Sequence, residues 1–170
     1  MKQLTVHVDG GMAGTQYAGA AAVARTSEGY FVGWLSRQLP MMTNNEAEYY
    51  ATQLGLTLAA GLGAKAVLIV SDSEVVVRQM SGLSRVMSQR LKRLHQQTCR
   101  QTAVFEQVSF RHVPREQNCL ADALATEAIN GRLVQMPGLV VTDPPEETSR
   151  PTLANWLRQW GQRTSRQPDN

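Results

Sequence analysis

One segment restricts the possible folds of this chain more than any other: the uninterrupted apolar run Ala66-Val67-Leu68-Ile69-Val70. A strand with one face in water alternates apolar and polar residues, whereas a strand buried on both faces is apolar throughout. Strands of the second kind occur in sheets that carry helices on both sides. The run therefore predicts an α/β domain with a partly parallel sheet.

Periodic segments on both sides of this run agree with that architecture. Strand patterns occur at residues 5–8, 19–24, 30–35 and 108–113. Helical patterns occur at residues 44–60, 72–80, 84–100 and 118–129. We expect the first strand to end in a tight turn at Asp9-Gly10-Gly11, and the next two strands to form an antiparallel hairpin. The predicted fold is α/β, with a five-stranded mixed sheet of an antiparallel hairpin and parallel strands, flanked by helices.

The composition is that of an ordinary globular protein. Of the 170 residues, 42% are hydrophobic and 18% are charged. No apolar run approaches the roughly 18 residues that a membrane-spanning helix needs, and the N-terminus does not resemble a signal peptide. Cys99 and Cys119 lack CxxC spacing, so we expect neither a disulfide framework nor a cysteine-based zinc site. These features predict a cytoplasmic protein without a membrane segment.

The organisation of the chain changes near residue 130. We expect one domain over residues 1–130, a linker-like extension over 131–151, and an amphipathic helix with a disordered tail over 152–170. Trp156 and Trp160 lie one turn apart on that helix, where they either pack back onto the domain or bind a partner protein. Packing back is favoured, because an exposed pair of tryptophans promotes aggregation. We expect the protein to be a monomer.

Basic residues gather in the window 85–115, most of which forms the third predicted helix and the last strand. The window holds seven basic residues and one acid, a formal net charge of +6 in a chain whose total is +3. A one-sided positive surface is suited to phosphate groups, although a solvated helix face has the same pattern. On the other face of the helix we expect a buried stripe of Met87, Leu91, Leu94 and Thr98. The basic residues are Arg85, Arg90, Lys92, Arg93, Arg100, Arg111 and Arg115, of which Arg90, Lys92 and Arg93 are candidate phosphate contacts.

Four acidic residues stand in apolar surroundings: Asp9, Glu48, Asp72 and Asp122. A buried carboxylate is unfavourable unless it is paired, and none of the four has a Lys or Arg beside it in the sequence. Strand ends and helix starts converge on one edge of an α/β sheet, so we expect the four carboxylates to meet there. Divalent cations would relieve their repulsion, and Mg²⁺ is the usual occupant of all-oxygen sites that act on phosphates.

Such a cluster is suited to two-metal hydrolysis of a phosphodiester bond. Two ions about 3.5–4 Å apart would activate a water on one side and stabilise the leaving oxygen on the other. This chemistry requires no histidine or cysteine nucleophile, in agreement with the absence of such a motif from the sequence.

Four motifs resemble, in chain order, the acidic motifs of type 1 ribonuclease H. They are Val6-His7-Val8-Asp9-Gly10-Gly11, Thr43-Asn44-Asn45-Glu46-Ala47-Glu48, Val70-Ser71-Asp72-Ser73 and Asn118-Cys119-Leu120-Ala121-Asp122-Ala123-Leu124-Ala125. Each motif alone is weak, but four in order with compatible spacing, between residue 3 and about residue 130, are specific. The resemblance implies a ribonuclease H-like fold and an endonuclease that cuts the RNA strand of an RNA–DNA hybrid. It also implies two Mg²⁺ or Mn²⁺ ions and products with 5′-phosphate and 3′-hydroxyl ends.

The resemblance implies roles for individual residues. Asp9, Glu48, Asp72 and Asp122 are the implied metal ligands, with Asp9 bridging both ions. Glu46 matches a capping box with Thr43 instead. The amides of the family's Thr-Asn-Asn stretch can read 2′-hydroxyls, although here they could also merely cap the helix. The implied hybrid-binding residues are Gly10, Gly11, Thr43, Asn44, Asn45, Ser73, Arg115 and Asn118.

The chain departs from the family's pattern in three places. The loop over residues 12–19 lacks the family's Asn-Pro-Gly, and the basic, tryptophan-rich protrusion of some bacterial members is absent. His112 lies ten residues before Asp122, like the family's mobile histidine, and is either catalytic or a strand histidine near the site. Arg115 is a substitute candidate for phosphate contact. His7 and His95 are not expected to bind metal.

Two other functions stay open. The first is a catalytically silent module that binds hybrids or duplexes. The presence of all four carboxylates disfavours this function, because a protein that only binds nucleic acid gains nothing from negative charge beside phosphates. The second is a ribonuclease H-like nuclease that acts on DNA, since fold and carboxylates alone do not determine the substrate.

Overall fold

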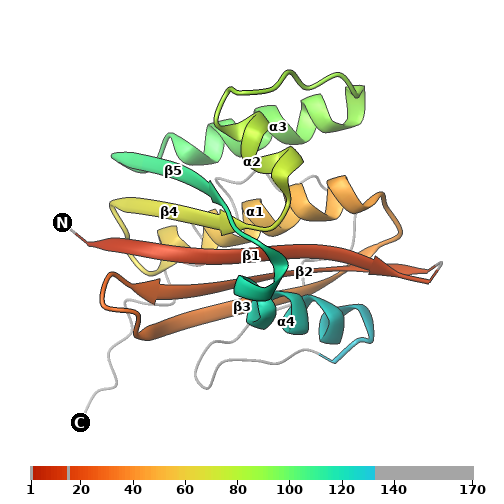
Figure 1. Ribbon diagram of the computed structural model, residues 1–170, viewed down its shortest axis with the longest axis horizontal. Helices are drawn as coiled ribbons and strands as arrows, with labels where there is room; N and C mark the ends of the chain where they lie inside the picture. The colour runs from red at the N-terminus through yellow and green to blue at the C-terminus, as the bar shows by residue number, and fades with distance from the viewer. Residues whose placement is uncertain (1, 15, 133–170) are drawn as a thin grey trace, which may run out of the picture. The chain divides into compact units, whose positions relative to one another are not determined.

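The computed structural model describes residues 2–14 and 16–132, which belong to one compact unit (Figure 1). Its elements follow in the order β1 (Gln3–Ala13), β2 (Tyr17–Thr26), β3 (Phe31–Pro40), α1 (Asn44–Gly61), β4 (Ala66–Ser71), α2 (Glu74–Met80), α3 (Gln89–Thr102), β5 (Gln107–His112) and α4 (Cys119–Ile129). A single 3-10 turn, Arg115–Gln117, precedes α4. None of the described helices is long and apolar enough to cross a membrane. The C-terminal helix with Trp156 and Trp160, and all but the first two residues of the predicted linker, lie outside the described residues.

The five strands form one mixed sheet in the order β3-β2-β1-β4-β5. The first three strands pair antiparallel, whereas β4 runs parallel to both β1 and β5. The apolar run that predicted this architecture lies in β4, where every residue except the half-buried Leu68 is buried. The predicted five-stranded mixed sheet is therefore confirmed.

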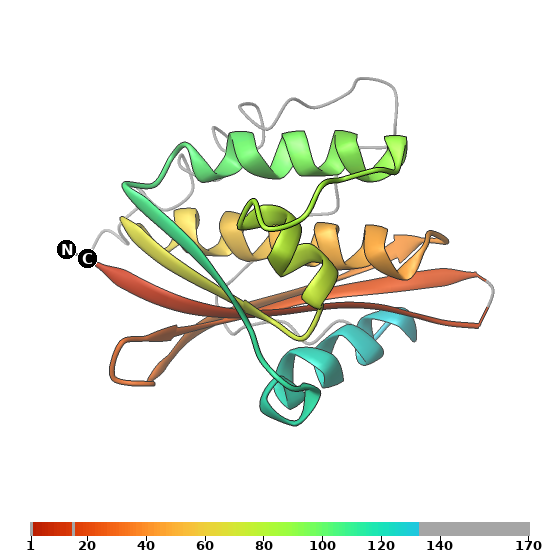
Figure 2. The ribbon, with the colours of Figure 1, turned by 45° about the horizontal axis from the view of Figure 1, so that its top comes forward.

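Helices cover both faces of the sheet, as Figure 2 shows. Helices α1 and α3 lie on one face, where α1 contacts β1 and β2 and also packs against α3. Helix α4 lies on the opposite face, where it contacts β1, β2 and β3. On that face Ala21 and Val23 of β2 pack against Leu124 and Ala125 of α4. The central strands are buried between these layers, as the sequence predicts.

Strand β1 is longer than predicted, and the expected tight turn at Asp9-Gly10-Gly11 is wrong. The strand continues to Ala13, because β2 supplies ladder partners along its whole length, including Ala21 opposite Asp9. Strand β4, in contrast, pairs with β1 only as far as His7. From Asp9 onward the edge of β1 that faces β4 has no partner strand among the described residues. Asp9 therefore lies within a strand that has one open edge.

Helix α3 begins at Gln89, five residues later than the predicted start at Ser84. The Oγ of Ser88 accepts a hydrogen bond from the backbone N of Leu91 at 3.4 Å, which makes Ser88 the N-cap. Met87 consequently lies in the preceding loop and is 78% exposed, so its predicted place in the buried stripe is wrong. Met87 has the spacing of the buried stripe, but the helix begins after its N-cap, Ser88, and so does not include Met87. The rest of the stripe, Leu91, Leu94 and Thr98, is buried as predicted.

Candidate active site

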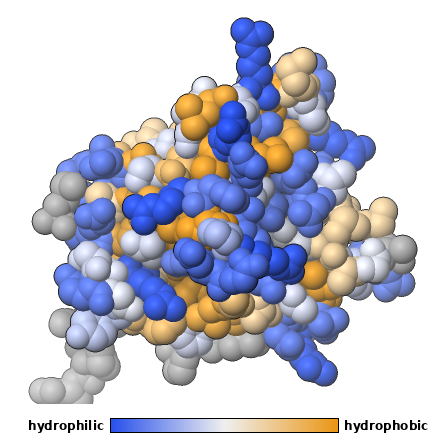
Figure 3. All heavy atoms as spheres, in the orientation of Figure 1, coloured by the Kyte–Doolittle hydropathy of each residue, from blue (hydrophilic) through white to orange (hydrophobic). Residues whose placement is uncertain are grey.

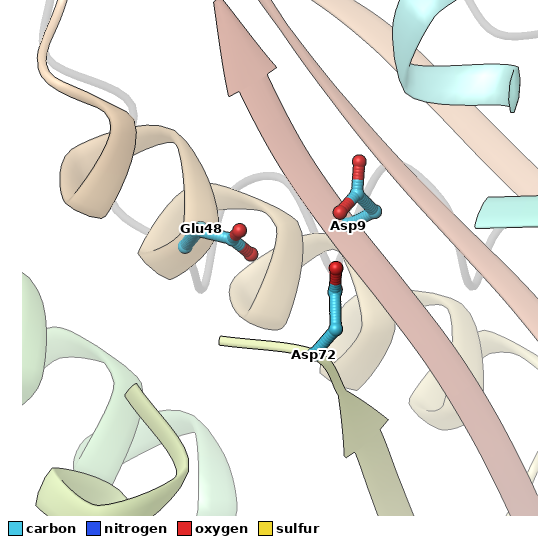
Figure 4. Close-up of side chains that lie close together, drawn as sticks. All are labelled: Asp9, Glu48 and Asp72. Atoms are coloured by element: carbon cyan, nitrogen blue, oxygen red, sulfur yellow. The ribbon is translucent and has the colours of Figure 1, made fainter. Parts of the chain in front are cut away.

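Three carboxylates meet where β4 ends beside the open edge of β1 (Figure 4). Asp9 lies within β1, Asp72 directly follows β4, and Glu48 lies in the first part of α1. One oxygen of each carboxylate lies within 4.8 Å of one oxygen of each of the others. The convergence predicted from the apolar surroundings of these residues is therefore present for three of the four acids.

The start of α1 determines where Glu48 lies. The backbone N of Glu46 donates to Thr43 Oγ1 at 3.3 Å, and the backbone N of Thr43 donates to Glu46 Oε2 at 2.8 Å. This reciprocal pair is the predicted capping box, and it confirms that Glu46 serves the helix end. Two residues later Glu48 is directed at β1, where its Oε2 accepts from the backbone N of Gly10 at 3.2 Å.

Burial and mutual repulsion disfavour the charged forms of two of these carboxylates. Asp9 and Glu48 are each 6% exposed. The pKa of Asp9 is raised to about 7, first by burial and then by the negative charges of Asp72 and Asp122. The pKa of Glu48 is raised to about 9, first by burial and then by Asp9 and Asp72. Arg115 opposes both shifts, but its effect is the smallest of the causes. The cluster therefore has a deficit of positive charge that a divalent cation would supply.

The fourth predicted ligand, Asp122, does not belong to this group of three. It lies in the first turn of α4, where its Oδ1 is 2.5 Å from Nη2 of Arg115. No basic residue lies beside Asp122 in the sequence, but the 3-10 turn before α4 brings Arg115 back beside this residue seven positions later. The Asp122 side chain is 30% exposed. It still raises the pKa of Asp9, so it borders the cluster.

His112 and Ser73 lie beside Asp72. His112 is the last residue of β5 and is exposed, and its Nε2 lies 3.2 Å from the backbone carbonyl oxygen of Asp72. This position corresponds to the strand histidine that the sequence offered as one of two alternatives. Ser73 is the N-cap of α2, and its Oγ accepts a hydrogen bond from the backbone N of Val76 at 3.5 Å.

Asn118 occupies the predicted N-cap position of α4, but its side chain makes no cap hydrogen bond. Nδ2 donates instead to the backbone carbonyl oxygen of Val8 and to Oδ1 of Asp72, each at 2.9 Å. The residue is 1% exposed, so its amide faces the interior and not a bound hybrid. The predicted cap is absent as a side-chain contact because the amide is turned toward Val8 and Asp72, which leaves Oδ1 facing His7 instead of the first turn of α4.

One residue of this site was missed by sequence reasoning. The Nδ1 of His7 lies 3.3 Å from Oδ1 of Asn118, and burial lowers the pKa of this histidine. His7 precedes Asp9 by two residues on the same strand, so both side chains lie on one face of β1. This spacing of two residues was the sequence signal that could have placed His7 near the site.

Of the predicted hybrid and phosphate contacts, Gly10 and Asn118 are buried, whereas two groups are exposed at helix starts. Asn44 and Asn45 are exposed at the start of α1, where Thr43 is the cap, so these asparagines are not the capping residues. Arg90, Lys92 and Arg93 are exposed on the first turns of α3. The charge of Arg90 contributes to the lowered pKa of Glu46, which places the starts of α1 and α3 near each other. On the face shown in Figure 3, hydrophilic residues gather across the middle of the molecule, between apolar patches.

Replacing Thr43 with alanine is expected to destabilise the protein by about 1 kcal/mol, because both hydrogen bonds of the capping box depend on this residue and its geometry. Equilibrium unfolding in urea measures the change. Thr43→Ser keeps the hydroxyl and is expected to retain most of the stability. An alanine variant as stable as the wild type would show that the cap contributes nothing here.

Divalent metal binding is expected to release protons and to weaken as the pH falls. At pH 7 the raised pKa values leave Glu48 mostly protonated and Asp9 about half protonated, and a metal requires both as carboxylates. Calorimetry of Mg²⁺ binding in buffers of different ionisation enthalpy should give roughly 1.5 protons released at pH 7. Without metal, the stability contributed by these groups is present below about pH 4 and is lost as the pH rises through 7 and 9. Proton-free binding, or affinity that does not change between pH 6 and 9, would contradict these pKa shifts.

Comparison with known proteins places the chain in a family. The model of the family described as reverse transcriptase-like matches residues 7–128. The bifunctional protein Rv2228c of Mycobacterium tuberculosis is 33% identical over 158 residues, which is 91% of this chain and 43% of that protein. Ribonuclease HI of Halobacterium salinarum is 36% identical over 88 residues, 52% of this chain and 44% of that protein. The chain spans less than half the length of the curated relatives it matches.

Solved structures agree with this relationship over nearly their whole length. The N-terminal RNase H domain of Rv2228c from M. tuberculosis, solved as a fusion with maltose-binding protein, superimposes with a TM-score of 0.74 at 32% identity, covering 78% of this chain and 96% of that one. RNase H1 of H. salinarum gives a TM-score of 0.73 at 30% identity, with coverage of 76% and 98%. LC11-RNase H1, solved in complex with an RNA/DNA hybrid, gives 0.71 at 30% identity, with coverage of 75% and 97%. By its family model, its sheet order and these relatives, the chain belongs to the reverse transcriptase-like family and, within it, to the type 1 ribonucleases H.

Proposed function

We propose that this protein is a ribonuclease H that hydrolyses the RNA strand of RNA–DNA hybrids and leaves 5′-phosphate and 3′-hydroxyl ends. The observation that carries the proposal is the convergence of Asp9, Glu48 and Asp72 at the end of β4, with two of the three carboxylates buried. The hybrid bound to LC11-RNase H1 supports the substrate class. The cytoplasmic location and the monomeric state belong to the same proposal.

The chemistry of the donor set fits divalent metal ions of the Mg²⁺ or Mn²⁺ kind. All the candidate ligand atoms are carboxylate oxygens, which hard cations prefer. The raised pKa values of Asp9 and Glu48 reflect burial and mutual repulsion, and a bound cation would offset both. Asp9, Glu48 and Asp72 would hold one ion, and Asp122 together with Asp9 would hold a second. When bound, the ions supply an activated water and stabilise the leaving oxygen.

The other residues of the site would bind and orient the hybrid. The exposed amides of Asn44 and Asn45 can donate to and accept from 2′-hydroxyl groups, the feature that distinguishes RNA from DNA. Arg115 is exposed beside Asp122, and its guanidinium can bind a phosphate through two N–H groups once the carboxylate no longer occupies it. His112, exposed beside Asp72, would accept a proton or assist product release.

Removing two charges from the start of α3 is expected to reduce the salt dependence of hybrid binding. Arg90 and Arg93 are exposed there, and each phosphate contact contributes about −0.9 to the slope of log K against log salt concentration for a B-form duplex. The double alanine variant should therefore have a slope shallower by roughly 1–2 in titrations over 50–300 mM KCl. Arg132→Ala, which removes a charge at the end of α4, is the control and should leave the slope unchanged. An unaltered slope in the double variant would mean that these arginines form only a solvated helix face.

The substrate is tested with two duplexes of identical sequence, an RNA–DNA hybrid and a DNA duplex, each with either strand labelled in turn. The proposal predicts cuts in the RNA strand of the hybrid alone, and end analysis should give 5′-phosphates. Cuts in the DNA duplex would favour the nuclease that acts on DNA. Binding of the hybrid without cleavage in Mg²⁺ or Mn²⁺ would favour the silent binding module.

A further inference from the structure

His7 occupies an unusual position for a histidine that the predicted chemistry does not use. It lies in the middle of β1, opposite Val23 of β2 and Val70 of β4, and it is half-buried. It shares a strand face with Asp9. Its Nδ1 lies 3.3 Å from Oδ1 of Asn118, a residue more than a hundred positions later in the chain. The imidazole is therefore in hydrogen-bond contact with the start of α4.

Asn118 connects this histidine to the carboxylate cluster. Its Nδ2 carries two protons, and two acceptors lie at hydrogen-bond distance, the carbonyl oxygen of Val8 and Oδ1 of Asp72, both at 2.9 Å. The side chain is buried, and it forgoes the helix cap that asparagine commonly makes. The amide thus joins β1, the end of β4 and the start of α4 at one point.

The two acceptors at Val8 and Asp72 determine which way the amide of Asn118 faces, and the contact with His7 holds it in that orientation. An amide rotated by 180° would direct Oδ1 at the Asp72 carboxylate and the Val8 carbonyl, two acceptors that would repel it. In the observed orientation Oδ1 faces Nδ1 of His7, so this nitrogen is assigned the proton and donates it. The imidazole thereby supplies the only hydrogen bond to Oδ1 among the described residues, and both protons of Nδ2 remain directed at Val8 and Asp72.

We propose that His7 is a positioning residue for Asp72 and that it acts through Asn118. The inference rests on the proposed function, because it concerns the carboxylate cluster as a metal site. Asn118 also accepts, through its backbone oxygen, the hydrogen bond from the backbone N of Asp122 at 3.1 Å. Orienting the Asn118 amide therefore orients Asp72 directly, while the backbone of Asn118 begins the helical turn that carries Asp122. A residue that is not itself a proposed ligand would control the geometry of Asp72.

The test is the affinity for Mn²⁺, measured by electron paramagnetic resonance without nucleic acid. His7→Phe keeps a planar ring and removes the Nδ1 donor, and it is expected to weaken Mn²⁺ binding about tenfold or more, the usual effect of losing a hydrogen bond behind a metal ligand. His7→Asn offers an N–H at the position of Nδ1 and is expected to restore most of the affinity. His95→Phe is the matched control, since His95 is a half-buried histidine on α3 that bonds Gln79 instead.

A double-variant cycle tests the route through Asn118. If His7 acts only by orienting that amide, His7→Phe should have no further effect on Mn²⁺ affinity in an Asn118→Ala background. Should the phenyl ring prevent folding, His7→Leu removes the same donor and is read in the same way. In cleavage of the hybrid, the His7→Phe defect should be recovered by raising the metal concentration, with an unchanged KM for the hybrid.

The outcomes separate this inference from the proposed function. Three results would each overturn the positioning role and leave the ribonuclease proposal intact. They are wild-type Mn²⁺ affinity in His7→Phe, equal defects in His7→Phe and His7→Asn, and additive effects in the double-variant cycle. A wild-type protein that binds no Mn²⁺ would contradict the metal site itself, and the positioning role would fall with it. Weakened affinity that His7→Asn restores, together with a non-additive cycle, would establish it.

Discussion

Replacing Asp9 with asparagine is expected to lower cleavage of an RNA–DNA hybrid by roughly a thousandfold or more. Asp9 lies within 4.8 Å of the other two carboxylates of the cluster, and its pKa is raised first by burial and then by Asp72 and Asp122. Asparagine keeps the shape of the side chain but removes one negative charge and one anionic oxygen. Weaker metal binding and poorer water activation should follow together, because both depend on the same carboxylate.

The same substitution should stabilise the metal-free protein, which distinguishes loss of chemistry from loss of fold. In the wild-type protein the pKa of the buried Asp9 is raised from 3.8 to about 7, so its charged form destabilises the folded state at neutral pH. At about 1.4 kcal/mol per pKa unit, removing a carboxylate that is disfavoured by burial and by the neighbouring acids is worth roughly 1–4 kcal/mol at pH 7 and above. The gain should vanish near pH 4, where the wild-type carboxyl is protonated in both the folded and the unfolded state.

Thermal unfolding and hybrid cleavage, measured on one preparation, test both parts of this prediction. Added Mg²⁺ should raise the melting temperature of the wild type and have little effect on Asp9→Asn. Glu116→Gln removes an exposed acid from the turn before α4 and is the matched control, with activity and stability near those of the wild type. An Asp9→Asn variant that cleaves normally would remove Asp9 from the mechanism.

Replacing Gly10 with alanine is expected to destabilise the fold by about 3 kcal/mol or more, the largest stability effect that we predict for a single methyl group. A Cβ at this position would lie 2.2 Å from both the carbonyl carbon and the oxygen of Ala47, and 2.5 Å from the backbone N of Glu48. These are backbone atoms of α1, so no side-chain rotation can relieve the overlap. Helix α1 would have to move away from β1, and Glu48 would move with it.

Gly11 supplies a matched control one residue later. Both glycines follow Asp9 in β1, and both were predicted to contact the hybrid, but a Cβ at Gly11 would meet no atom within 4 Å. Gly11→Ala should therefore change the free energy of unfolding by no more than about 0.5 kcal/mol. Urea unfolding of the two variants measures the difference. Equal stabilities would mean that β1 and α1 do not approach as closely as the structure has them.

Much of this fold could be predicted because local patterns carry the information. The apolar run at Ala66–Val70 identified the buried parallel strand, since only burial on both faces removes alternation. The capping box at Thr43 and Glu46 marked the start of α1 to the residue, because both of its hydrogen bonds connect positions three apart in the chain. Three of the four carboxylates converge as predicted. Asp72 follows a strand end and Glu48 lies near the start of a helix, whereas Asp9 joins them from within β1, beyond the last residue that pairs with β4.

What could not be predicted depends on partners far away in the sequence. Strand β1 continues through Gly10 because β2 pairs with it, and nothing in the segment itself indicates that partner. The Asp122 carboxylate pairs with Arg115 only because a 3-10 turn folds the chain back, although that pairing connects residues seven apart. Asparagine is a common N-cap residue, yet the amide of Asn118 donates to Val8 and Asp72, two acceptors that only the tertiary fold brings to it.

The most direct test of this account is a cleavage assay with purified protein and a hybrid whose RNA and DNA strands carry distinguishable 5′ labels. Mg²⁺ and Mn²⁺ are supplied in separate reactions, and a third reaction contains a chelator. The account predicts that the RNA strand is cut in the presence of at least one of the two ions, that chelation stops cleavage, and that the DNA strand stays intact. Protein that binds the hybrid and leaves the RNA strand whole with both ions would contradict it.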